Sequence, residues 1–227
     1  MNYSEVKKEL KKEFESFLKP LGYKSKSGAQ GCEFILLKEL TTFRIGYGVA
    51  NYIDEFTTGC YLGIGILPIQ KIVYKLEDVK EVTDNYGSTI ASGISHYFNE
   101  LNYDYRIKTT ENIKEWGAIV RKFYEEYAIP FLEKYNTVDA IDKLVNTNPS
   151  ERVIYCDDLA WRMMNGLISA KLNNNPKYED LKSYYRAEVE RIYQGHFKYS
   201  DCIKVIEFLD SHSQEELLKI TEVQKAH

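Results

Sequence analysis

The sequence predicts an α+β protein with an N-terminal helix, an antiparallel sheet of four to six strands and a helical C-terminal half. Three patterns predict this fold class. Apolar residues recur at steps of three and four over residues 6–21, alternate with period two over residues 32–67, and return to a spacing near 3.6 over residues 111–224. The short period is typical of strands with one buried face, and the longer period is typical of amphipathic helices.

The first helix has a clear apolar face and a clear end. Its expected end is at Pro20 and Gly22, since proline cannot continue a helix and glycine favours the turn that follows one. The residues expected to form the buried face are Val6, Leu10, Phe14, Phe17 and Leu21.

The next segments predict a central strand and a hairpin. Residues 33–38 are apolar on both faces, as in a central strand. Residues 43–50 and 59–66 alternate, and the short segment between them predicts a hairpin connection. Because paired residues share a face, we expect the pairs Ile45–Ile64 and Tyr47–Leu62, with the turn centred on Asp54 and Glu55.

Residues 88–98 fit both a strand and a helix. Gly93 and the serine and threonine content favour the strand. Residues 103–108 alternate and predict a further extended segment.

The helical half is expected to start after Thr110, a suitable N-cap. Pro130 must kink or break this first helix, because its ring clashes with the preceding turn. A short helix over residues 138–145 follows. The expected buried stripe of the first helix is Ile113, Trp116, Val120, Phe123 and Tyr127.

Residues 146–150 form the best linker in the chain, and three or four helices are expected beyond it. Their predicted boundaries are Asn175-Pro176 as a start, Gly195 as an end and Ser213 as a capping-box residue. The linker divides the chain into an α+β domain, residues 1–146, and a helical extension, residues 150–227, packed on it.

Composition limits the classes of function. The net charge of −4 gives no electrostatic help toward nucleic acid and is compatible with a basic protein partner. No apolar run approaches the roughly 20 residues of a membrane span. The N-terminus begins a charged amphipathic helix without an apolar leader, so a cytoplasmic location is expected. The oligomeric state is open.

The four cysteines and four histidines show no metal-ligand spacing, so we expect no metal, no cofactor and no disulfide. The glycine pairs at 46/48 and 63/65 lie inside strands, whereas phosphate-binding glycines lie between a strand and a helix. The sequence therefore offers no catalytic residue, and an enzyme is the less favoured class.

Small side chains on one face of the hairpin form the most distinctive constellation. The small residues of this face are Gly46, Gly48 and Ala50 on one strand and Gly59, Gly63 and Gly65 on its partner. One interpretation is that a helix, such as residues 111–129, packs closely on this smooth surface. The other is a shallow groove for a ligand or partner. The predicted binding residues, including the hairpin turn, are Arg44, Tyr52, Asp54, Glu55, Tyr61 and Tyr97.

Two segments carry a resemblance to a known family. Residues 18–23, Leu-Lys-Pro-Leu-Gly-Tyr, end the first helix, and residues 129–135, Ile-Pro-Phe-Leu-Glu-Lys-Tyr, are followed by Thr137-Val138-Asp139-Ala140. Residues 3–146 thereby resemble a bacterial family known as a domain of unknown function, found partly near toxin–immunity loci. The resemblance implies an α+β fold without established enzyme activity and supplies no catalytic residues.

These observations favour a cytosolic binding protein without catalytic activity, of an immunity or antitoxin-like kind. The alternative is an enzyme or sensor that binds a small molecule over the glycine-rich sheet face. A third interpretation is a structural interaction module that uses the C-terminal helices.

Overall fold

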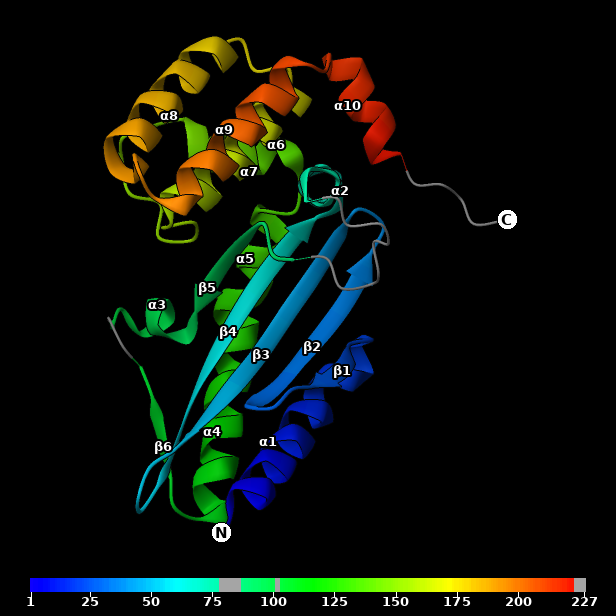
Figure 1. Cartoon of the computed structure of the whole chain (residues 1–227). Helices are drawn as coiled ribbons and strands as arrows, with labels where there is room; N and C mark the ends of the chain where they lie inside the picture. Colours follow the sequence, from blue (N-terminus) through cyan, green and yellow to red (C-terminus); the bar gives the residue numbers. More distant parts are fainter. Residues whose placement is uncertain (78–86, 101–102, 223–227) are drawn as a thin grey trace. The chain divides into compact units, whose positions relative to one another are not determined.

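The computed structural model describes residues 1–77, 87–100 and 103–222, and it confirms the predicted α+β fold (Figure 1). Contacts within the chain define two compact units. Residues 1–64 and 91–134 form the first unit, and residues 65–90 and 135–227 form the second. Residues 65–90 and 135–146 are thus grouped with the C-terminal helices, whereas the sequence assigned them to the first domain.

A six-stranded sheet runs in the order β1-β2-β3-β4-β5, and β6 also pairs with β4. The pairs β1–β2, β2–β3 and β4–β6 are antiparallel. The strands are β1 (Lys24–Ser27), β2 (Gly31–Lys38), β3 (Thr41–Asn51), β4 (Phe56–Ile66), β5 (Ile90–Gly93) and β6 (Tyr105–Ile107).

One face of the sheet is covered by helices. The first helix, α1 (Tyr3–Leu18), packs Phe14 against Phe34 and Tyr47, with ring centroids 5.7 and 4.8 Å apart. Helix α4 (Thr110–Phe123) lies on the same side of the sheet as α1 (Figure 1). The expectation that this helix packs on the glycine-rich face is therefore wrong, and we call that opposite face the outer face.

The first helix ends at Leu18, about one turn before Leu21, the last residue of the predicted buried face. Leu18 is fully buried as its last residue, while Leu21 lies in a short 3₁₀ turn and is exposed. Gly22 follows with φ of 92°, a conformation that favours glycine.

The β3–β4 hairpin turns one residue earlier than predicted. The backbone N–H of Tyr52 donates to the carbonyl of Glu55 at 2.9 Å, which centres the turn on Ile53 and Asp54. Counted back equally along both strands from this turn, Ile45 lies opposite Leu62, two residues from the predicted partner, and Gly46 lies opposite Tyr61, which is its closest neighbour. A shift of two residues leaves each side chain on the same face, and the four residues of the predicted pairs are all buried.

Residues 88–98 are neither one strand nor one helix. Strand β5 ends at Gly93, and helix α3 (Ile94–Phe98) begins directly after it. The strand preference is therefore wrong beyond Gly93. Tyr97 lies on helix α3 and not, as predicted, on the sheet.

Helix α2 (Leu67–Leu76) follows β4 without a linker and was not predicted. It begins at Leu67-Pro68, where proline is well tolerated, and buries Ile69, Ile72 and Val73.

The N-cap of α4 is Thr109, one residue before the predicted one. Helical backbone continues from α4 through a π-helical segment, Tyr124–Ala128, into α5 (Ile129–Lys134), so the chain does not break at Pro130. The local irregularity is the π-helical segment that lies directly before Ile129 and Pro130.

The remaining helices belong to the second unit. They are α6 (Val138–Asn146), α7 (Leu159–Leu172), α8 (Tyr178–Tyr193), α9 (Phe197–Asp210) and α10 (Gln214–Thr221). The capping box at Ser213 and the helix end before Gly195 are confirmed. Asn175 is not the N-cap of α8, which is Lys177; the Asn175 side chain instead accepts from the Lys177 N–H at 2.9 Å.

Candidate functional site

A hollow of about 430 Å³ lies on the outer face of the sheet in the first unit, beside the β3–β4 hairpin. It opens broadly to solvent. Its floor and walls come from both strands of the hairpin and from two segments distant in sequence. The residues that define it are Gln30, Gly48, Ala50, Tyr52, Tyr61 and Asp104.

The glycines of this face have two different structural roles. A Cβ atom at Gly46 would lie 2.5 Å from Cζ of Tyr61, so the tyrosine ring crosses this glycine closely. A Cβ atom at Gly48 would have no neighbour within 4 Å, and one at Gly59 would lie 3.7 Å from Oδ1 of Asp104. Gly46 thus makes room for Tyr61, and Gly48 leaves the floor of the hollow open.

The predicted anchor Arg44 is buried. Only 6% of Arg44 is exposed, and its Nη1 donates to Oε2 of Glu33 at 2.7 Å. Tyr61 remains 42% exposed beside this ion pair. Burial and the charge of Glu33 raise the pKa of Tyr61 to about 12, so its hydroxyl stays protonated at neutral pH. Arg44 therefore supports the face from within, and Tyr61 is available for contact.

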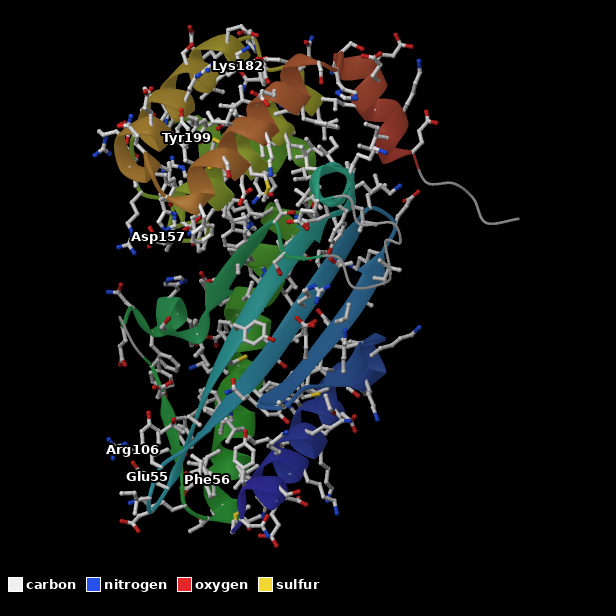
Figure 2. The ribbon with its side chains drawn as sticks, in the orientation of Figure 1. Glu55, Phe56, Arg106, Asp157, Lys182 and Tyr199 are labelled. Carbon is white, nitrogen blue, oxygen red and sulfur yellow. The ribbon has the colours of Figure 1, made fainter. Side chains whose placement is uncertain are left out.

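The end of the hairpin is exposed and held in place. Tyr52 is 58% exposed and Ile53 is fully exposed. Glu55 is partly buried and forms ion pairs with Arg106 at 3.0 Å and Lys108 at 3.2 Å (Figure 2). Because Arg106 belongs to β6, these ion pairs join the hairpin to a neighbouring strand, and Asp54 stays exposed at the turn.

The remaining predicted residue, Tyr97, lies away from the hollow. Its hydroxyl donates to Oε2 of Glu126 at 2.5 Å, and its ring packs edge-on against Phe123 and near Tyr127. The structure therefore brings Tyr52 and Tyr61 together at the hollow, places Asp54 and Glu55 at the adjoining turn, and separates Arg44 and Tyr97 from it.

Two lining residues and one turn residue were missed by the sequence analysis: Gln30, Asp104 and Ile53. Gln30 and Asp104 come from other segments, and no local pattern links them to the hairpin. Ile53 gave a usable signal, because turns favour glycine, asparagine and aspartate over a β-branched apolar residue.

A serine–histidine pair occurs elsewhere in the first unit. The Ser92 hydroxyl lies 2.9 Å from Nδ1 of His96 and 2.9 Å from the Tyr127 hydroxyl. Such a pair can activate a nucleophile where a substrate can approach. Ser92 is only 4% exposed, so these hydrogen bonds hold β5 against α3 and the π-helical segment.

The second unit contains an apolar groove of about 550 Å³ between α2, α7 and α9. Phe197, at the start of α9, is 71% exposed at this groove. The lining also includes Val73, Trp161, Met163 and Val205. It is a second candidate contact surface. Its charged lining residues are two acidic and two basic side chains, Glu77, Asp201, Lys198 and Lys204, so no net charge selects one occupant.

All four cysteines are buried free thiols. Burial raises the pKa of Cys202 to about 11 and that of Cys156 to about 12, and it also raises the pKa of Cys32 and Cys60. Across the described residues, no three histidine, cysteine, aspartate or glutamate side chains come together in a way that could hold a metal ion.

Comparison of this chain with protein-family models, curated proteins and solved structures gave no match. The resemblance to a domain-of-unknown-function family therefore stays a prediction. Of the helices in the described ranges, none has the length and apolar character required to cross a membrane.

Proposed function

We propose that the protein is a non-catalytic binding protein that contacts a basic protein partner through the end of the β3–β4 hairpin and the adjoining hollow. The observation that carries the proposal is the fully exposed Ile53, next to the largely exposed Tyr52, on a turn braced by the ion pairs of Glu55. Apolar and aromatic side chains held on a fixed turn are well suited to insert into a partner.

The lining of the hollow supports binding by contact and hydrogen bonding. Tyr52 and Tyr61 provide aromatic surface, Gln30 provides an amide, and Asp104 provides a carboxylate. The net charge of −4 favours electrostatic attraction to a basic partner. An immunity or antitoxin-like role, in which the partner is a basic toxin, is the form of this function that the family resemblance suggests.

The experiment is affinity capture by the full chain, with variants of the exposed turn. We expect Ile53→Asp to lose a basic protein that the wild-type chain retains. The matched control is Ile192→Asp, which changes another exposed isoleucine in the second unit. Both changes should leave folding stability within about 0.5 kcal/mol, as is usual for exposed positions.

The affinity for the captured protein then gives a quantitative test. Truncating a true anchor, Ile53→Ala or Tyr52→Ala, should cost about 2 kcal/mol of binding free energy, or roughly 30-fold in Kd. Equal capture by Ile53→Asp and by the control would contradict the proposal.

A second candidate function is the recognition of a small molecule in the hollow, by a sensor or an enzyme. The observation in its favour is the volume of about 430 Å³, within the range of roughly 300–1,000 Å³ typical of ligand pockets. A metabolite that binds the wild-type chain but not Gly48→Val, in the absence of a protein partner, would favour this candidate over the first.

A further inference from the structure

We propose that the hollow on the outer face receives a cationic side chain of the partner, the ammonium group of a lysine or the guanidinium group of an arginine. This inference rests on the proposed function and names the chemical group that the hollow recognises. It depends on the charge at the wall, the aromatic rings beside it and the open floor.

The charge is supplied by Asp104. This side chain is exposed at the edge of the hollow, and its Oδ1 lies close to where a Cβ atom at Gly59 would stand, at 3.7 Å. Two cations lie on the neighbouring segment, Arg106 and Lys108, and both are held by the Glu55 carboxylate. Within the part of the chain that the structure describes, Asp104 forms no ion pair, so its charge remains available to an incoming cation.

The aromatic rings are those of Tyr52 and Tyr61, which line the same hollow. The face of an aromatic ring attracts an ammonium or guanidinium group through its quadrupole. The ring of Tyr61 is fixed over Gly46, and its hydroxyl keeps its proton at neutral pH, so it presents no competing negative charge. A carboxylate together with aromatic rings selects a cation over an anion or a neutral apolar group.

The floor provides the space. Gly48 leaves more than 4 Å free where a side chain would begin, and Ala50 adds only a methyl group. The long aliphatic stems of lysine and arginine pack well on such a surface while the charged group reaches a polar wall. Gln30 offers a further amide oxygen at the hollow.

The test uses the full-length protein and simple probes. Amide chemical shifts are followed during titration with N-acetyl-arginine amide, N-acetyl-lysine amide and the neutral N-acetyl-glutamine amide, at low ionic strength. We expect both cationic probes to shift the amide signals of Gly48 and Gly59, the neutral probe to shift them far less, and added salt to weaken the effect.

Two variants and one control locate the site. Asp104→Asn and Gly48→Val should each weaken binding of the cationic probes by about tenfold or more, whereas Glu39→Gln, at the exposed turn between β2 and β3, should change it less than about twofold. A well-dispersed amide spectrum establishes that each variant is folded. Equal shifts by the neutral probe, or unchanged affinity in Asp104→Asn, would overturn the inference.

The two proposals can fail separately. Capture of a basic partner that depends on Ile53, without binding of the cationic probes at the hollow, refutes this inference and leaves the proposed function. Binding of the probes at Gly48 and Gly59, without any Ile53-dependent protein partner, supports this inference and refutes the proposed function.

Discussion

Gly166 lies in the middle of α7, at a close approach to α6, and its replacement by alanine should destabilise the protein. A Cβ atom there would lie 2.8 Å from Oδ1 of Asn146, 3.0 Å from Cγ1 of Val145 and 3.2 Å from the Tyr185 hydroxyl. These neighbours are buried and cannot easily move, because Asn146 donates to Asp142 at 2.7 Å and to the Gly166 carbonyl at 2.8 Å.

The magnitude follows from three effects. Alanine favours a helix interior over glycine by about 1 kcal/mol. Overpacking of a filled core costs about 2 kcal/mol, within its usual range. Displacement of Asn146, which also accepts from the Tyr185 hydroxyl at 3.1 Å, disrupts buried hydrogen bonds at a cost of about 2 kcal/mol. The free energy of unfolding should therefore fall by about 3 kcal/mol in Gly166→Ala.

Urea unfolding followed by circular dichroism measures this change, and a second helical glycine provides the control. At Gly117 in α4, the three nearest neighbours of an added Cβ atom all belong to the partly buried Glu13 side chain, the closest being Cγ at 2.3 Å. This side chain must therefore change its χ1 rotamer, at a cost of about 1 kcal/mol, which the helix preference of alanine offsets. Gly117→Ala should therefore change stability by less than about 1 kcal/mol in either direction. If Gly166→Ala is as stable as the wild type, or if both variants lose the same stability, the packing argument is refuted.

Two further predictions concern acid stability and thiol reactivity. Burial acts to raise the pKa of Asp158, but Lys198 at 2.6 Å and the capped N–H of Trp161 outweigh it and hold that pKa below its usual range. This stabilisation is present above the unfolded-state pKa of about 4 and is lost as the pH falls below it. Asp158→Asn keeps a capping oxygen but removes the titrating group, so its melting temperature should fall less than that of the wild type as the pH drops below about 4. An unchanged dependence of the melting temperature on pH would count against this. The buried, protonated thiols should react with an aromatic disulfide reagent at pH 7 only after denaturation, and rapid labelling of Cys202 in the native protein would contradict that expectation.

The fold class was predictable because its signals are local. The helix end near Pro20, the helix end before Gly195 and the capping box at Ser213 each depend on residues within a few positions of one another. Strand β1 was missed because Lys24–Ser27 has no apolar alternation and is extended only through its pairing with β2, for example Lys24 with Ile35. Helix α2 was missed because it follows β4 without any polar residues to mark the change of period.

The site was only partly predictable, because it depends on register and on distant segments. The small residues and Tyr61 indicated the hollow, since alternation alone assigns them to one face. The ion-pair partner of Arg44 depends on the register between β2 and β3. In this register Arg44 pairs with Ile35, and Glu33, two residues before Ile35 on the same face, lies within reach of the guanidinium group. Asp104 reaches the hollow only because β6, which follows it, pairs with β4.

The turn at Ile53 connects the fold to the proposed function. A two-residue turn gains most from glycine, asparagine or aspartate, and a fully exposed isoleucine contributes no buried area to the fold. Glu55, one position beyond the turn, nonetheless joins it to Arg106 and Lys108. The chain thus restrains a turn whose apolar side chain adds nothing to folding. Because the backbone of this turn is already restrained, covering Ile53 would cost less conformational entropy, and under the proposed function Ile53 would contribute to the free energy of binding.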